Sequence, residues 1–210
     1  MNRRFFAQFA AAVLTAVTLG LAPAVHAADE SPDAMIKRLS DEVMSAIKSD
    51  KALQSGDMNR LMALVDSKIM PNVNFQRMTA SAVGPAWRQA TPEQKQRLQD
   101  EFKTLLIRTY SGALDQVNDQ VISVKPQRSG PADTEVVVRT EVRGRGDPIQ
   151  LDYRMEKTPT GWKIYNLNVL GVWLVETYRS QFAQEINSKG VDGLIATLAE
   201  RNRSNAARKG

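Results

Sequence analysis

Few residues in this chain have the side chains that catalysis normally uses. The sequence contains no cysteine, and its single histidine is His26. With no thiol and no other imidazole, the chain lacks the parts of a cysteine or serine triad and of a thiolate or imidazole metal site. Neither a GxxxxGK[ST] phosphate loop nor a GxSxG nucleophile motif occurs. These absences argue against most hydrolases and zinc enzymes, and we expect no metal and no cofactor.

The remaining side chains that could take part in catalysis or bind a charged ligand are tyrosines and arginines. Tyr110 and Tyr153 are the candidates for an acid or a base that faces an interior, and the spacing places no carboxylate beside them. Arg139 and Arg154 carry the planar fork that binds phosphate through two hydrogen bonds. Alternation puts both arginines on the polar face of their strands. A solvated strand surface is the simpler interpretation for them, and the mouth of a binding site is the sharper one.

The N-terminal residues have the features of a secretory signal peptide. The basic pair Arg3-Arg4 precedes an uncharged stretch, and small residues around Ala27 fit a cleavage site. The apolar part is shorter than the roughly 20 residues that cross a bilayer. The sequence therefore predicts a cleaved signal peptide over 1–27, a single domain over 28–200 and a basic, flexible tail over 201–210.

The charge pattern does not indicate nucleic-acid binding. The formal net charge is +5, and Arg3 and Arg4 of the predicted signal peptide contribute two of these charges. The other basic residues are scattered, with no interleaved aromatic residues. The local basic run at 201–210 is more simply a solvated tail than a site for anionic lipid head groups. We therefore expect no nucleic-acid partner.

The hydrophobic period changes from about 3.6 residues to 2 near the middle of the chain. Helical spacing and a capping box at Thr91–Gln94 predict several helices in the first half. Between Val121 and Val172, four apolar-polar runs separated by turns predict an antiparallel meander with one apolar face. Two more helices are predicted after Trp173, and Gly190 separates them. This order of elements predicts an α+β fold.

The stretch from Val169 to Val175 is apolar on both alternating faces. Two arrangements of the interior fit the predicted elements. The helices can pack flush on the sheet, as in most close-packed interiors. Alternatively the sheet curls around a hollow, and Gly171 within a strand is typical of such a bend. The two-sided stretch favours the second arrangement, with one face serving a ligand and the other a returning helix.

Four motifs occur in order over most of the chain: GPAWRQATPEQ at 84–94, WKIYNLNVLGV at 162–172, YRSQF at 178–182 and GVDGLI at 190–195. Together they resemble the family of periplasmic toluene-tolerance and MlaC-type phospholipid-binding proteins. Two places depart from the family pattern. Asn166 replaces a common aspartate, and the stretch 71–75 lacks an expected aromatic or acidic residue.

The resemblance implies a nuclear-transport-factor-2-like fold, with a curved four-stranded sheet and helices around a deep apolar cavity. It implies a phospholipid carrier in the periplasm of a Gram-negative cell, with no catalytic residue. Its partners would be an inner-membrane ABC transporter complex with MCE domains and an outer-membrane lipoprotein–porin complex. Shuttling lipid between the two would maintain outer-membrane lipid asymmetry.

For such a carrier, the candidate contacts with the acyl chains are apolar or aromatic residues of the long helix and the strands. They are Phe102, Leu106, Tyr110, Val138, Leu151, Tyr153, Met155, Val169 and Val172. Ordinary core packing is an equal alternative for each. Arg154 and Arg139 are the candidates for the mouth or the head group.

Two other functions remain open at this point. The same fold hosts enzymes that act on hydrophobic small molecules, and Tyr110 or Tyr153 would then supply the acid or base. The chain could also be a lipid-free adaptor between membrane complexes, with a filled core. Phospholipid that co-purifies with the protein distinguishes the carrier from both.

Overall fold

The computed structural model of the protein describes residues 30–112, 120–126, 130, 132–144 and 147–207. The predicted signal peptide and the last residues of the predicted tail lie outside the described residues. Within the described part, none of the helices combines the length and apolar content needed to cross a membrane.

Helices come first along the chain. The α-helices are α1 Pro32–Ser49, α2 Lys51–Gln54, α3 Met58–Leu64, α4 Phe75–Val83 and α5 Pro92–Tyr110, with the short irregular turns η2 Val65–Ile69, η3 Met70–Asn72 and η4 Gly84–Arg88 between them. The strands follow as β1 Val121–Val124, β2 Glu135–Arg143, β3 Ile149–Thr158, β4 Gly161–Val169 and β5 Val172–Trp173. Helix α6, Leu174–Ala207, closes the chain. The predicted α+β order is therefore confirmed.

Helix α5 starts at the predicted capping box. The Thr91 hydroxyl accepts a hydrogen bond from the backbone N–H of Gln94, and the Gln94 side chain accepts one from the backbone N–H of Thr91. These reciprocal bonds satisfy two donors that the first helical turn leaves without partners. Pro92 occupies the first helical position, where no N–H is needed.

The sheet is an antiparallel meander in the order β1-β2-β3-β4-β5. It has five strands where the sequence predicts four, because the last predicted strand does not continue to Val172. The chain turns at Leu170 and Gly171, which have φ angles of 53° and 86°. Positive φ at both central residues is the geometry of a two-residue hairpin turn. Val172 then pairs back with Val169 in the short strand β5.

Strand β4 carries one extra residue relative to β3. Arg154 pairs with Asn166 and Met155 pairs with Ile164, so Tyr165 has no partner in the register. Side chains alternate between the two faces of a strand, and an inserted residue reverses that alternation beyond it. The irregularity in this strand is therefore the bulge at Tyr165. Gly171, which the sequence predicts as the site of a bend within the strand, lies in the turn after it.

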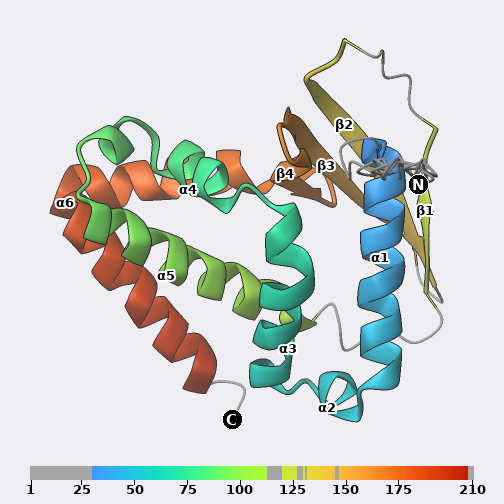
Figure 1. The fold of residues 1–210 in the computed structure, drawn as a ribbon. Coiled ribbons are helices and arrows are strands. Elements are labelled where there is room, and N and C mark those ends of the chain that lie inside the picture. Colours follow the sequence, from blue (N-terminus) through green and yellow to red (C-terminus); the bar gives the residue numbers. More distant parts are fainter. Residues whose placement is uncertain (1–29, 113–119, 127–129, 131, 145–146, 208–210) are drawn as a thin grey trace, which may run out of the picture.

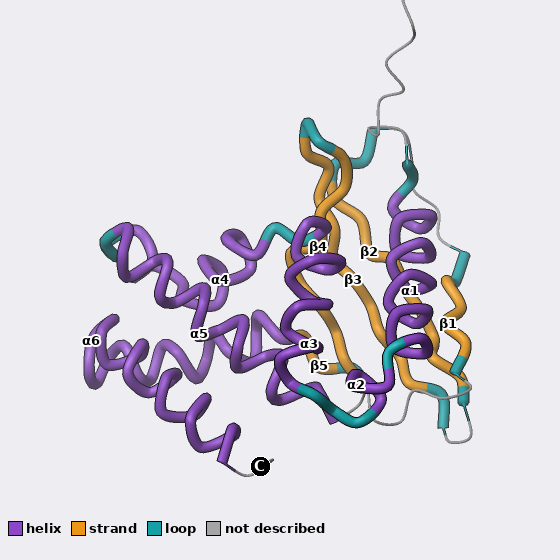
Figure 2. The backbone as a smooth tube through the Cα atoms, turned by 60° about the horizontal axis from the view of Figure 1, so that its bottom comes forward, coloured by secondary structure: helices purple, strands orange, loops and turns teal. Residues whose placement is uncertain are grey.

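Helix α1 defines the inner face of the sheet. Its buried Met35 and Ile36 pack with Val138, Met155 and Ile164 of the strands. Figure 2 shows α1 and α3 lying in front of the strands, while α4, α5 and α6 form a bundle to one side. Figure 1 shows the same bundle beside the sheet and places α3 between the bundle and α1. Helices thus cover the inner face from two directions.

Helix α6 consists of two segments that meet at Gly190, as the sequence predicts. Gly190 has φ 71° and ψ −175°, a conformation that side chains with a Cβ rarely adopt. The second segment extends to Ala207. Asn202 is buried in it and donates a hydrogen bond to the carbonyl oxygen of Glu101 at 2.9 Å. Residues 201–207, predicted as part of a basic, flexible tail, thus continue the helix, and Asn202 attaches it to α5.

The buried apolar residues of the described chain separate into three clusters. The bundle cluster joins α4, α5 and α6, and includes Phe75, Leu98, Phe102, Tyr178 and Phe182. The sheet cluster joins α1 to the strands through Met35, Ile36, Leu39, Val138, Met155 and Ile164. The α3 cluster contains Ile47, Leu53, Leu61 and Leu64. A domain of this size more often has one contiguous core.

The start of α6 is tied to the sheet by one buried side chain. Asn166 is 1% exposed. Its Oδ1 accepts a hydrogen bond from the N–H of Val175 at 3.1 Å, and its Nδ2 donates to the Glu176 carboxylate at 2.8 Å. Asn168 is buried as well, and it accepts a hydrogen bond from the N–H of Gly171.

We predict that Asn166→Ala lowers the free energy of unfolding by about 1–3 kcal/mol, because it leaves the buried Val175 N–H without an acceptor. Urea denaturation measures this loss. The control is Asn187→Ala, an exposed position on α6, which should change stability by less than about 0.5 kcal/mol. Equal effects of the two substitutions would show that Asn166 does not anchor the helix.

Candidate functional site

The strand register collects the predicted apolar contacts of the sheet on its inner face. One row across the sheet runs from Thr140 through Leu151 and Val169 to Val172. Directly paired residues of antiparallel strands point to the same face. A second row joins Val138, Tyr153 and Leu167, and Met155 pairs with Val136 and Ile164 in a third.

Burial divides these candidates into two groups. Val138 and Met155 are fully buried in the sheet cluster beneath α1. Leu151, Tyr153 and Val169 are only half-buried, although they lie further along the same face. Val172 is 49% exposed, at the end of the first row. Exposure thus increases from beneath α1 toward the β4–β5 turn.

Tyr153 lies deep in the protein and yet keeps accessible surface. Burial raises the pKa of its phenol, which requires that protein surrounds the hydroxyl. The residue is nevertheless only half-buried and lies at the edge of the sheet cluster.

Helix α5 brings the other three candidates toward the sheet from the bundle. Phe102 is fully buried, and its ring lies edge-on to Tyr178 and Phe182 at centroid distances of 5.0 and 5.2 Å. Leu106 and Tyr110 are half-buried at the edge of the bundle cluster. Burial raises the pKa of Tyr110 as well. Phe102 is thus packed among aromatic rings, while the other two lie at the boundary of that core.

Arg154 lies on the outer face of the sheet, opposite the apolar rows. Its guanidinium forms an ion pair with Glu176 and stacks on the ring of Trp173 at 4.0 Å. Burial disfavours the charged form of Glu176, but hydrogen bonds from Asn166 and Arg154 outweigh it, so the pKa of Glu176 is lowered. The described structure therefore already engages this arginine between the sheet and the start of α6.

Arg139 shares the outer face with Arg154 and is exposed. A further arginine on this face, Arg77 of α4, pairs with Glu135 and Glu156 and stacks on Tyr165 at 3.7 Å. The hydrogen bond from Arg77 lowers the pKa of Glu135. Polar interactions thus dominate the outer face, and apolar residues dominate the inner one.

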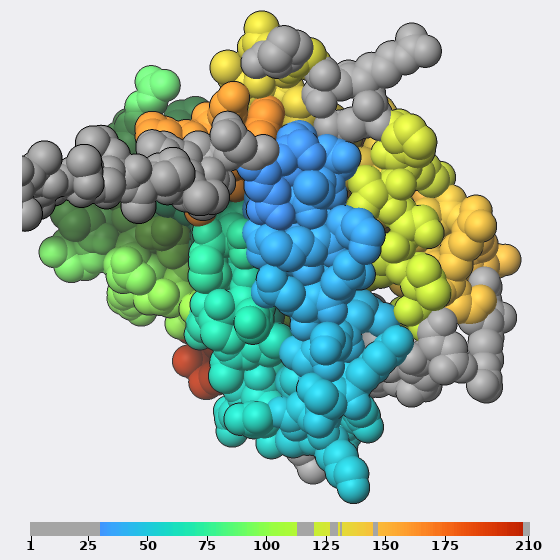
Figure 3. Space-filling model, turned by 45° about the vertical axis from the view of Figure 1, so that its right-hand side comes forward, coloured from blue at the N-terminus to red at the C-terminus, as the bar shows by residue number. Residues whose placement is uncertain are grey.

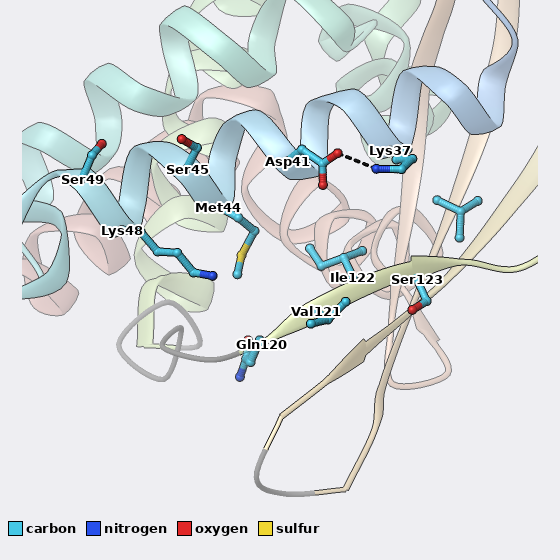
Figure 4. Close-up of a pocket in the computed structure, with 11 residues that line it drawn as sticks. Lys37, Asp41, Met44, Ser45, Lys48, Ser49, Gln120, Val121, Ile122 and Ser123 are labelled. Carbon is cyan, nitrogen blue, oxygen red and sulfur yellow. Dashed lines mark hydrogen bonds and ion pairs between the residues drawn. The ribbon is translucent and has the colours of Figure 1, made fainter.

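A groove with a volume of about 880 Å³ lies between α1 and β1. Figure 3 shows these two elements next to each other on one face of the molecule. Met44, Val121, Ile122 and Val124 form the apolar part of its lining, and Lys37, Asp41, Lys48 and several hydroxyl side chains form the polar part. Figure 4 shows Lys37 and Asp41 joined by an ion pair, with a distance of 2.6 Å.

The sequence interpretation missed two features of the site. Leu167 belongs to the inner face beside Tyr153, and Asn166 holds α6 from the outer face. A signal for both was present in the apolar pattern of β4. Trp162 and Ile164 follow one phase, whereas Leu167 and Val169 follow the other, and such a phase change predicts a bulge.

The fold and this surface define an α+β protein with helices packed on the apolar face of an antiparallel sheet. Within the described residues, no group of acidic or histidine side chains is placed to hold a metal ion. A model of the MlaC protein family matches residues 37–200. The chain belongs to the MlaC family.

Individual relatives agree with this assignment. The chain is 27% identical to the toluene tolerance protein ttg2D of Pseudomonas putida over 177 residues, covering 84% of this chain and 82% of that protein. It is 24% identical to the intermembrane phospholipid transport system binding protein MlaC of Haemophilus influenzae over 177 residues, covering 82% of this chain and 83% of the relative.

A solved structure is more similar in sequence than either of these relatives. It is the phospholipid-binding protein from Ralstonia solanacearum in complex with a phospholipid. The two proteins share 49% sequence identity and a TM-score of 0.81, over 83% of this chain and 98% of the other. The antiparallel sheet packed against helices is therefore the fold of that protein too.

We predict that Arg154→Met reduces the loss of stability on acidification. Because the pKa of Glu176 is lowered in the folded protein, its carboxylate stabilises the fold at pH values above 4.5, the ordinary pKa of glutamate. This stabilisation is lost as the pH falls through the lowered pKa of the folded state. Because the pair is partly exposed, the pH-dependent part should be about 0.5–1 kcal/mol. Urea denaturation between about pH 5 and pH 3 measures it.

The matched control is Arg139→Met, on the same face of the neighbouring strand. No ion pair of Arg139 is present among the described residues, so this variant should follow the wild-type pH profile. If both variants change the profile equally, the Arg154–Glu176 pair is not its source.

Proposed function

We propose that this protein is a phospholipid carrier that holds the acyl chains of its cargo between the inner face of the sheet and the helices. The observation that carries the proposal is its 49% identity to a protein solved in complex with a phospholipid, over nearly the whole of that chain. The Haemophilus relative, named as the binding protein of an intermembrane phospholipid transport system, supports the same role. As a member of the MlaC family, the chain is a binding protein and not an enzyme.

The divided core supports an interior that accepts a ligand. The bundle cluster and the sheet cluster both include strand residues, and several residues at their edges keep accessible surface. Leu151, Tyr153 and Val169 approach this region from the sheet, while Leu106 and Tyr110 approach it from α5. We propose that these half-buried residues line an apolar cavity of a nuclear-transport-factor-2-like fold.

The nine predicted contacts have different parts in this proposal. The half-buried residues and Val172 contact the acyl chains directly. Phe102, Val138 and Met155 are fully buried, and they form the wall behind the first layer. A head-group role for Arg139 and Arg154 stays a prediction, and their place on the outer face gives it no support.

The free energy of burial explains why such a protein acts as a carrier. Each buried methylene contributes about 0.8 kcal/mol, so a chain of about 16 carbons contributes roughly 12 kcal/mol before the costs of binding. Two such chains approach the limit of non-covalent affinity. Escape into water is therefore very slow. Transfer from one apolar environment to another is nearly neutral, and release takes place while the protein is docked.

The location and partners follow from the same proposal. The predicted signal peptide exports the chain to the periplasm of a Gram-negative cell. There it exchanges lipid with an inner-membrane ABC transporter complex that bears MCE domains and with an outer-membrane lipoprotein–porin complex. This exchange maintains the lipid asymmetry of the outer membrane. The family match and the transport-system name of the Haemophilus relative support this assignment.

The experiment that tests the carrier function is mass analysis of lipid extracted from the purified protein. We expect phospholipid at a fixed ratio to protein, retained through gel filtration in plain buffer at micromolar protein concentration. Protein that contains no phospholipid and acquires none from vesicles would contradict the proposal, as would rapid loss of bound lipid into buffer.

We also predict that Leu151→Trp reduces the ratio of phospholipid to protein at least twofold, because the larger side chain occupies space that the acyl chain needs. Stability, measured on delipidated protein, should change little. At fully buried Val138, the enlargement Val138→Phe should instead cost about 1–3 kcal/mol through overpacking. Equal destabilisation at both positions, with an unchanged lipid ratio for Leu151→Trp, would place Leu151 in a filled core.

A further inference from the structure

The β4–β5 turn contains the one residue other than glycine with positive φ among the described residues. That residue is Leu170, with φ 53°. A branched side chain is disfavoured in this left-handed region, and the same turn position strongly prefers Asn or Gly. Gly171 follows it with φ 86° and has no atoms close to the position of a Cβ. The turn is therefore of the Asn-Gly type, but with leucine in the place of asparagine.

Hydrogen bonds hold this turn in its strained form. The N–H of Gly171 donates to Oδ1 of buried Asn168 at 2.8 Å, and the N–H of Leu170 donates to the carbonyl oxygen of Gln150 at 3.1 Å. A disfavoured conformation persists where the surrounding structure determines it, and such positions are common at functional sites. The leucine is therefore fixed in position, and backbone preference does not explain its presence.

Packing does not explain the leucine either. Leu170 is 64% exposed, and Val172 beyond the turn is 49% exposed. Together with Val121, they are the large apolar residues that are exposed in the described part of the chain. An exposed apolar side chain on a strained backbone contributes little to stability and keeps its place most readily through a contact that the isolated protein does not make.

The row of residues on the inner face leads to this turn. Leu151 pairs with Val169, Val169 pairs with Val172, and exposure increases along the row. Because cross-strand partners share a face, Val172 continues the apolar surface of the interior to the outside. The turn is thus the place where the proposed acyl-chain site reaches solvent.

We propose that Leu170 and Val172 form the apolar rim over which an acyl chain of the carried phospholipid leaves and enters the interior. This inference rests on the proposed carrier function and names the exit of that site. Each methylene that leaves the protein for water loses the free energy of its burial. An apolar rim shortens the stretch of chain that water contacts during passage and so increases the rate of transfer, while the affinity of the interior stays the same.

The test uses the mature full-length chain loaded with phospholipid and vesicles of palmitoyl-oleoyl phosphatidylcholine as acceptor. Mass analysis of the lipid left on the protein gives the transfer rate. Leu170→Asn should raise the melting temperature by about 2–4 °C, because Asn-Gly suits the turn. The same variant should hold the wild-type amount of lipid and transfer it at least threefold more slowly. A gain in stability together with a loss of rate is not expected of a residue with a purely structural role.

Val172→Thr is the second variant, since it keeps the shape of the side chain and replaces a methyl group with a hydroxyl. It should also slow transfer, and its lipid content is measured together with the rate because Val172 contacts the acyl chain. The matched control is Val121→Thr, because Val121 is 63% exposed but pairs with Arg143 on the outer face of the sheet. This control should transfer lipid at the wild-type rate.

The outcomes separate this inference from the carrier function. If both rim variants carry lipid and transfer it at the wild-type rate, the rim inference is overturned and the carrier function stands. A slower rate for Val121→Thr as well would reveal a general effect of surface polarity and would also overturn the inference. If the wild-type protein carries no phospholipid, the carrier function fails, and the rim inference fails with it.

Discussion

The inner and outer faces of the sheet depend on one inserted residue in β4. Without the bulge at Tyr165, Asn166 and Asn168 would share the inner face with Ile164, and two amides would interrupt the apolar surface. With it, Leu167 and Val169 extend that surface toward the β4–β5 turn. The same insertion places Asn166 where it holds the first turn of α6. One local irregularity therefore creates both the continuous apolar face and the attachment of α6 to the sheet.

The two faces then have different tasks. On the outer face, Arg77 and Arg154 each form an ion pair and also stack on an aromatic ring. These interactions fix α4 and α6 against the strands. These contacts attach the helices through the outer face, so residues of the inner face need not supply that attachment. A protein that carries a hydrocarbon chain needs this separation, because residues that contact the cargo cannot also supply all the packing that holds the fold together.

Much of the fold was predictable from local patterns. The capping box at Thr91, the change from helical to strand period and the break at Gly190 each depend on residues close together in the chain. The order of the elements and the family motifs were also readable. The turn at Leu170 was not, because leucine is a poor indicator of positive φ. The packed end of α6 depends on Asn202 reaching Glu101 of another helix, and no local pattern reports such a contact.

The sequence by itself determined the fold class, the family and the lack of thiol and imidazole chemistry, since composition, periodicity and motifs are properties of the linear chain. Only the tertiary structure decided which of the candidate residues are fully enclosed and which keep open surface. Val138 and Leu151 are both apolar residues of neighbouring strands, but Val138 is fully buried beneath α1 and Leu151 is only half-buried. The physical reason is that burial depends on which distant helix covers each position, and the order of residues along a strand does not contain that information.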